Sequence, residues 1–185
     1  MRISGLGLAP SFAIAVLNFA ASAQDLDLAM SGFAVAPPPG YIAAPGVPRS
    51  PSQVSVRLTK PAEPDVSCEV SFEVLPGFEN FTQGALNRQT ENPGWDLFYR
   101  DGLSDFYTVL DVARFDHAGV RGARVTGISK PKPAIAGWAA GQPALVFMFY
   151  TPKGVNMVAC VAPQALFKAH RAEFEQVVRS VKLAQ

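Results

Sequence analysis

The sequence predicts an α+β fold in which an antiparallel β-sheet is sandwiched between helices and a C-terminal amphipathic helix packs on the sheet. Three observations predict it. Residues 68–74 alternate apolar and polar side chains, the period of a half-buried antiparallel strand. Residues 145–151 and 155–161 are apolar runs around Pro152-Lys153-Gly154, typical of a central hairpin buried on both faces. Residues 166–181 repeat apolar side chains every three or four positions, which indicates an amphipathic helix.

Residues 1–23 predict a cleaved signal peptide. Arg2 precedes an apolar stretch from Leu6 to Phe19, and Ala21-Ser22-Ala23 is a small-x-small cleavage site, so we expect cleavage after Ala23. The apolar stretch is shorter than the roughly 20 residues that span a bilayer, and no later segment resembles a membrane span. An uncleaved N-terminal anchor is the alternative. We therefore expect a periplasmic or secreted protein without a membrane span in the mature chain.

Residues 24–53 predict a Pro-, Ala- and Gly-rich linker that is disordered and precedes the folded domain. The segment contains Pro37-Pro38-Pro39-Gly40 and Pro45-Gly46-Val47-Pro48 and carries almost no charge. A polyproline-type docking segment is the alternative. Residues 54–185 are then expected to form a single globular α+β domain, because about 130 residues suffice for one core of ordinary size.

Shorter signals predict five further elements of this domain. Their ends are marked by Gly, Pro and Asn, which favour turns. In chain order they are a strand at 54–58, a helix at 80–90, strands at 95–99 and 105–115 joined by an Asp-Gly turn at 101–102, and a strand at 122–129.

Cys68 and Cys160 are expected to form one disulfide bond. An oxidising compartment lets thiols pair, and both residues lie in strand-like segments that can be neighbours. Closing a loop of about 90 residues stabilises the fold by roughly 4 to 5 kcal/mol in the chain-entropy model. The alternatives are a nucleophilic thiol, for which His170 is the nearest base, and a zinc site completed by His117 and His170. The zinc alternative lacks the paired close spacing of such sites.

Charge and motifs exclude several classes of function. Sixteen Lys and Arg stand against 15 Asp and Glu, so the chain is nearly neutral and lacks the basic face that nucleic acid requires. It contains no Gly-x-Ser-x-Gly elbow, no His-Glu-x-x-His motif, no phosphate-binding loop and no dinucleotide fingerprint. We therefore expect no catalytic residues, no cofactor, no metal and no nucleic-acid partner, and we interpret His170 as a structural residue of the C-terminal helix.

A cluster of aromatic residues around positions 95 to 107 is the candidate ligand or partner surface. Aromatic rings beside a few polar groups are typical of apolar pockets and of protein interfaces. The alternative is that these rings fill the core on one sheet face. The candidate residues are Trp95, Phe98, Tyr99, Arg100, Phe106 and Tyr107.

Three short segments resemble the PsbP-like superfamily, the fold of an extrinsic photosystem subunit. They are Phe72–Phe78, with its Pro-Gly-aromatic turn, Gly141–Ala144 before a strand, and Phe174–Leu183 at the end. The resemblance covers most of residues 68–185. It implies an antiparallel sheet sandwiched between helices, in proteins that mostly bind partners or stabilise complexes. No catalytic residue carries over, because the matched positions are turn and core residues, and Phe78 stands where tryptophan is expected.

These observations predict an exported, periplasmic, non-catalytic binding or accessory protein of the cell envelope, with an envelope protein as its partner. A carrier with an aromatic-lined pocket for a small apolar ligand is the alternative, and a sizeable pocket among the aromatics would favour it. An envelope hydrolase assembled from distant residues is the third class. A polar cleft holding His117 beside aspartates would favour the hydrolase.

Overall fold

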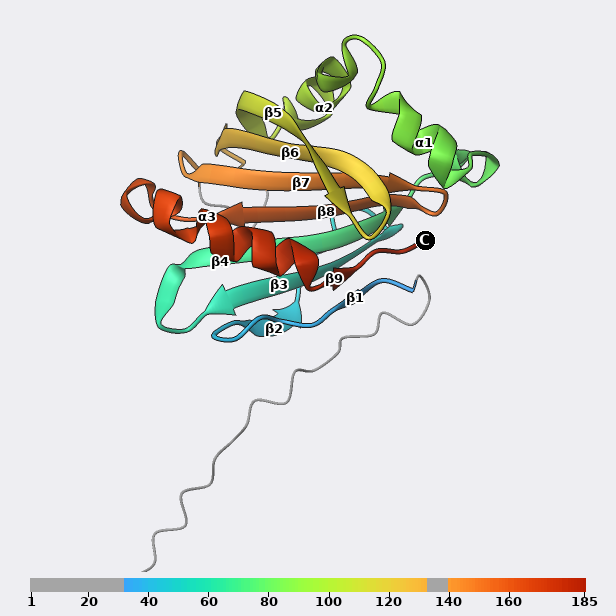
Figure 1. Cartoon of the computed structure of the whole chain (residues 1–185). Helices are drawn as coiled ribbons and strands as arrows, with labels where there is room; N and C mark the ends of the chain where they lie inside the picture. Colours follow the sequence, from blue (N-terminus) through green and yellow to red (C-terminus); the bar gives the residue numbers. More distant parts are fainter. Residues whose placement is uncertain (1–31, 133–139) are drawn as a thin grey trace, which may run out of the picture.

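The chain folds into nine strands and three α-helices within residues 32–132 and 140–185, which a computed structural model describes (Figure 1). The strands are β1 (Ala34–Val35), β2 (Ile42–Pro45), β3 (Gln53–Lys60), β4 (Glu63–Val74), β5 (Tyr107–His117), β6 (Val120–Ser129), β7 (Pro143–Thr151), β8 (Gly154–Val161) and β9 (Val181–Lys182). The α-helices are α1 (Gln83–Gln89), α2 (Trp95–Leu103) and α3 (Gln164–Arg179), and a 3-10 turn covers Phe78–Asn80. The predicted α+β class is confirmed.

Seven strands form one antiparallel sheet in the order β2-β3-β4-β8-β7-β6-β5, and β1 pairs with β9 in a second sheet. The predicted central hairpin is confirmed, because β7 and β8 pair with each other and lie between β4 and β6. Every residue of β7 except Tyr150 is buried. Strands buried on both faces need consecutive apolar residues, which explains why this segment lacks alternation.

Helices contribute core residues on both faces of the sheet. Leu145 and Phe147 of β7 share one core cluster with Phe174 of α3. Ala144, Val146 and Met148, whose side chains point to the opposite face, share a second cluster with Tyr99 and Leu103 of α2. The predicted C-terminal helix is present as α3, and Pro163 stands immediately before its first residue.

The predicted disulfide bond between Cys68 and Cys160 is confirmed. The two residues are directly opposite each other on β4 and β8, with their Cα atoms 4.0 Å apart. Side chains of directly opposite residues in an antiparallel pair leave the sheet on the same face, so the two sulfur atoms meet. The bond removes both thiols from the nucleophile and zinc alternatives.

The predicted strand at 95–99 and the predicted Asp-Gly turn at 101–102 are wrong, since both segments belong to α2. Gly94 precedes this helix with a left-handed backbone conformation (φ 73°, ψ 11°). Trp95, Tyr99 and Leu103 then recur every four residues and face the sheet. A window this short contains too few residues to separate a period of two from a period of 3.6.

The predicted linker over residues 24–53 is wrong for its second half, where β1 and β2 form. Phe33 and Val35 are completely buried, and Tyr41 is nearly so, in the core cluster that also contains α3. The prolines misled the prediction, because Pro45 lies in β2, an edge strand that tolerates a residue without an N–H. Residues 1–31 lie outside the described residues, so the signal peptide stays a prediction.

Candidate binding pocket between α1 and α2

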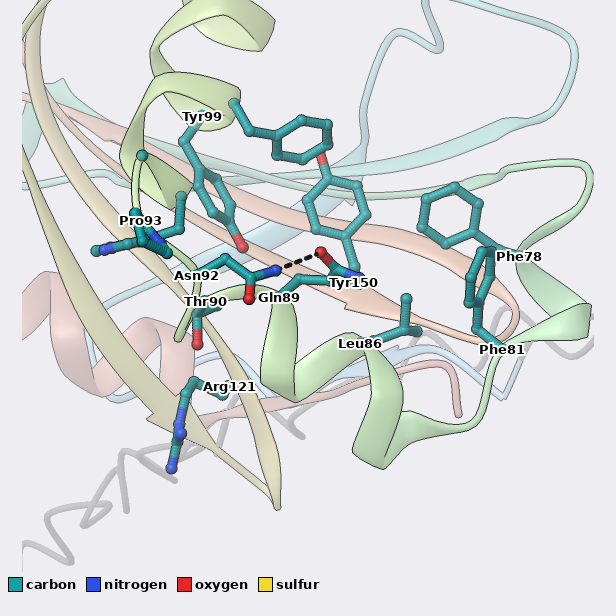
Figure 2. A pocket seen from close by; sticks show the side chains of 13 residues that line it. Phe78, Phe81, Leu86, Gln89, Thr90, Asn92, Pro93, Tyr99, Arg121 and Tyr150 are labelled. Atoms are coloured by element: carbon teal, nitrogen blue, oxygen red, sulfur yellow. Dashed lines mark hydrogen bonds between the residues drawn. The ribbon is translucent and has the colours of Figure 1, made fainter.

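A pocket of about 470 Å³ lies between α1, α2 and the end of β7 (Figure 2). This volume is within the range of small-molecule sites, which are mostly apolar with a few polar groups. The pocket is lined by Phe78, Phe81, Leu86, Gln89, Thr90, Asn92, Pro93, Gly94, Trp95, Phe98, Tyr99, Arg121 and Tyr150. The continuous stretch from the turn after β4 through α1 to α2 supplies most of its wall, and β6 and β7 of the sheet supply Arg121 and Tyr150.

Tyr150 lies at the centre of the aromatic contacts in the pocket. Its ring centroid is 5.3 Å from that of Phe98, 5.6 Å from that of Phe78 and 5.9 Å from that of Tyr99. Trp95 extends the group, with its ring 5.7 Å from the ring of Tyr99. Such offset and tilted pairs stabilise the arrangement beyond the area that they bury. The pocket therefore has a wall of mutually packed rings.

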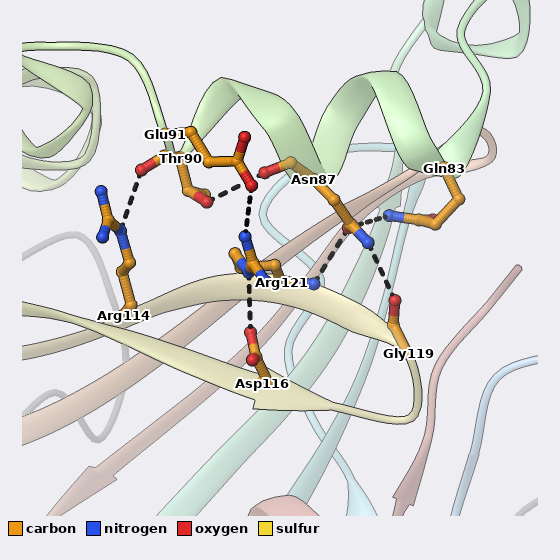
Figure 3. Close-up of polar contacts among 8 residues, drawn as sticks. All are labelled: Gln83, Asn87, Thr90, Glu91, Arg114, Asp116, Gly119 and Arg121. Carbon is orange, nitrogen blue, oxygen red and sulfur yellow. Dashed lines mark hydrogen bonds and ion pairs between the residues drawn. The ribbon is translucent and has the colours of Figure 1, made fainter.

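Hydrogen bonds fasten α1 to the turn between β5 and β6 (Figure 3). The side-chain amide of Asn87 donates to the Gly119 carbonyl at 3.0 Å, and its oxygen accepts from the Arg121 backbone N–H at 3.0 Å. Gln83 donates to the Tyr150 carbonyl at 3.0 Å. Thr82 caps the helix by accepting from the Ala85 N–H. These contacts fix the helix that forms one pocket wall.

The charge in the pocket lining is neutralised. Arg121 is the one charged residue among the described lining residues, and its guanidinium is 2.6 Å from a Glu91 oxygen and 3.3 Å from an Asp116 oxygen (Figure 3). Outside the lining, the guanidinium of Arg114 stacks over Trp95 at 5.3 Å from the ring centroid. Two carboxylates around one guanidinium leave no excess positive charge to attract an anion.

The two tyrosine hydroxyls at the pocket stay protonated at neutral pH. Burial raises the pKa of Tyr150 to about 12. Burial and the neighbouring Tyr150 raise the pKa of Tyr99 further. A protonated phenol is uncharged and can both donate and accept a hydrogen bond. The pocket is therefore suited to binding a neutral group.

The structure separates the six residues of the predicted surface. Trp95, Phe98 and Tyr99 line the pocket, whereas Arg100 forms an ion pair with Asp96 on α2 at 3.2 Å. Phe106 and Tyr107 line a different hollow of about 220 Å³, in which Tyr107 is almost completely buried. The single surface predicted from the sequence is thus divided between two places.

The sequence prediction did not include Phe78, Phe81, Leu86 or Tyr150. Phe78 was a visible signal, because an aromatic directly after the Pro76-Gly77 turn is placed at the end of β4. Tyr150 carried a weaker signal as the one residue of β7 that is not buried. Nothing local indicated that these rings meet α2, since that contact depends on the tertiary fold.

The two histidines have structural partners. The imidazole of His117 bonds through Nε2 to the Val181 carbonyl oxygen at 2.7 Å, which ties β5 to β9. His170 lies between two carboxylates, with Nε2 2.8 Å from Glu63 and Nδ1 2.7 Å from Glu173. Among the described residues, no group of three or more His, Cys, Asp or Glu side chains is arranged to hold a metal ion.

The chain has a PsbP-like fold, as the resemblance predicted. The structure is similar to the solution structure of cyanobacterial PsbP (CyanoP) from Synechocystis sp. PCC 6803, with a TM-score of 0.56. The match covers 96% of this chain and 98% of that chain at 16% sequence identity, so it shows the fold alone. The chain matches no protein-family model and no curated protein sequence.

Proposed function

We propose that this chain is an exported, non-catalytic accessory protein of the cell envelope that binds an envelope protein through the surface around α2. The observation that carries the proposal is a set of exposed apolar side chains, two of them in the pocket lining and the third, Leu97, next to Phe98 on α2. Phe81, Leu97 and Phe98 have exposed fractions of 46%, 58% and 57%. Large apolar side chains gathered at one place on a surface mark interaction sites.

Three further observations support the proposal. The PsbP-like fold is consistent with an accessory role, which the sequence resemblance implied. The disulfide bond between Cys68 and Cys160 suits an oxidising compartment such as the periplasm. In the described residues no helix combines the length and the apolar composition needed to cross a bilayer. A periplasmic protein that docks on an envelope partner would have these properties.

Site-specific crosslinking tests the proposal. A photoreactive residue at Leu97, introduced into the chain in its own cells, is expected to crosslink one defined envelope protein. The matched control is Leu166, an exposed leucine on α3, which belongs to the other face of the sheet. A crosslink at Leu97 that Phe98→Asp abolishes supports the proposal. Equal labelling at Leu97 and Leu166, or none at either, contradicts it.

A small-molecule carrier is the second candidate, and the size of the pocket favours it. Native mass spectrometry of the mature protein, purified from its own envelope without reduction, tests this candidate. A retained small molecule would make the chain a carrier. The disulfide-bonded protein without an adduct, lighter than the reduced chain by two hydrogens, would leave the accessory role as the better proposal.

A further inference from the structure

We propose that the pocket between α1 and α2 binds a neutral, flat, ring-bearing small molecule with a hydrogen-bond acceptor that meets the Tyr99 hydroxyl. This inference rests on the carrier form of the proposed function and names its ligand class. Three properties of the pocket carry it: the packing of its rings, the pairing of its one charged lining residue with carboxylates, and the position of its polar atoms.

The rings favour a flat apolar ligand. Trp95, Phe98, Tyr99 and Tyr150 all line the pocket, and their contacts with one another are tilted or edge-on, with none of them stacked face to face. A planar ring system can stack on the faces of these rings, whereas a branched aliphatic chain matches them poorly. With Phe98 more than half exposed at the rim, a ligand can enter without unfolding α2.

The lining disfavours a charged ligand. Arg121 is occupied by Glu91 and Asp116, as described above, and the other described lining residues carry no charge. An anion would meet two carboxylates already placed around Arg121, and an ion of either sign would lose its hydration on entering the apolar part of the lining. Transferring an unpaired ion into an apolar pocket is costly. A neutral ligand avoids both penalties.

The polar atoms offer a hydrogen-bond donor to a ligand that carries an acceptor. Figure 2 shows the Tyr99 ring directing its hydroxyl into the pocket, towards the side where Gln89 and Asn92 lie. No hydrogen bond described between residues 32–132 and 140–185 involves this hydroxyl, and it is not one of the fully buried polar atoms that lack a partner, so it is accessible within the pocket. Asn92 donates its amide to the Gln89 oxygen at 3.1 Å, so that pair is internally bonded. A ketone, ether or similar oxygen on the ligand would satisfy the Tyr99 donor.

Titration with three matched probes tests the inference. The probes are naphthalene, 2-acetylnaphthalene, which adds a carbonyl acceptor, and 2-naphthoate, which adds a negative charge. Calorimetry or ligand-detected NMR gives each Kd. We expect 2-acetylnaphthalene to bind most tightly and 2-naphthoate most weakly. Tyr99→Phe should weaken 2-acetylnaphthalene about fivefold, the usual effect of one hydrogen bond, and leave naphthalene unchanged.

Two further variants control for general effects on the fold. Tyr107→Phe removes a hydroxyl outside the pocket and should leave every Kd unchanged. Phe98→Ala removes an exposed ring and should weaken naphthalene and 2-acetylnaphthalene by similar factors. Unchanged melting temperatures show that each variant is folded.

Three results would overturn the inference: no saturable binding of any probe, tighter binding of 2-naphthoate than of 2-acetylnaphthalene, or an equal Kd for 2-acetylnaphthalene in the wild type and Tyr99→Phe. None of these results involves a partner protein. The ligand assignment can therefore fail while the Leu97 crosslink is still formed, and the crosslink can fail while the probes still bind.

Discussion

His170 illustrates how one residue joins two distant parts of the chain. Both of its ring nitrogens lie within hydrogen-bonding distance of a carboxylate, Glu63 from β4 and Glu173 from α3. The Lys60 ammonium contacts the same two carboxylates at 2.6 Å and 3.0 Å. The cluster therefore holds the start of β4 against the helix. Its charges face one another in a partly buried position, so it should respond to acid.

The first prediction concerns the loss of this cluster at low pH. Hydrogen bonding from Lys60 lowers the pKa of Glu63 below 4.5. A lowered carboxylate pKa stabilises the fold above pH 4.5, and this contribution disappears as the pH falls through the lowered value. We expect the free energy of unfolding, measured by urea titration, to fall less steeply below pH 4.5 in Glu63→Gln than in the wild type.

Burial alone would raise the pKa of Glu173, but hydrogen bonds from His170 and Lys60 lower it overall, so this carboxylate has the same sign of response. Asp65→Asn is the control, because Asp65 is an exposed acid of the same strand. An identical pH profile for Glu63→Gln and the wild type would show that the cluster does not contribute to acid sensitivity.

The sequence predicted some residues of the candidate site and not others. The prediction included Trp95, Phe98 and Tyr99 because several aromatic residues close together in the sequence can be recognised without knowing the fold. Tyr150 was hidden within an apolar run that already had a complete explanation as a buried strand. The place of Tyr150 in the pocket depends on α2 covering the end of β7. A contact between segments so far apart in sequence cannot be deduced from the residue itself. The assignment of these residues to a binding site stays a prediction until a ligand or partner is measured.

At the scale of elements, the long periodic patterns and the strand signals at 54–58, 105–115 and 122–129 were predicted correctly, whereas residues 95–103 were not. The hairpin of β7 and β8 and the helix α3 each contain enough residues to define one period. Residues 95–103 do not. Aromatic side chains favour strands, and Asp101-Gly102 favours a turn, so local propensity gave the wrong answer. Packing of Tyr99 and Leu103 on the sheet overrides that propensity.

The second prediction tests how α1 is held. Asn87→Ala removes two hydrogen bonds to the turn between β5 and β6 and leaves the Arg121 N–H without that acceptor. We expect the free energy of unfolding to fall by about 1 to 2 kcal/mol. Hydrogen exchange should accelerate in α1 and remain unchanged in α3.

Asn80→Ala is the matched control, because the Asn80 side chain makes one exposed bond, to the Gly77 carbonyl within its own turn. It should change stability by less than about 0.5 kcal/mol. Equal exchange rates in α1 of the wild type and Asn87→Ala would mean that apolar packing of Leu86, and not the amide, holds the helix.

At the scale of the whole molecule, the fold begins earlier in the chain than composition suggested. Residues 33–45 have the proline and alanine content of a linker, yet they complete the core beside α3. Composition averages over a window, whereas burial is decided by a few side chains, here Phe33, Val35 and Tyr41. The overall class was predictable because the sheet and the last helix dominate the pattern.

The third prediction measures this contribution. Phe33→Ala should lower the free energy of unfolding by about 3 to 5 kcal/mol, because Phe33 is completely buried and packs against Phe72 at 6.2 Å between ring centroids. Val47→Ala, in the same proline-rich segment but 63% exposed, should have an effect below about 0.5 kcal/mol. Equal urea midpoints for the two variants would mean that residues 33–53 do not contribute to the core and act as a linker.

The pairing of β1 with β9 joins the first described strand to the last one, with Ala34 opposite Lys182. A chain that is delivered N-terminus first, from a ribosome or through a channel, presents Ala34 long before its partner. Cys68 likewise cannot form its disulfide bond until Cys160 has been delivered with β8. Folding is therefore postponed to the end of delivery. During that interval the waiting strands are open to pairing with other chains, so this protein should depend on holding factors while it is being delivered.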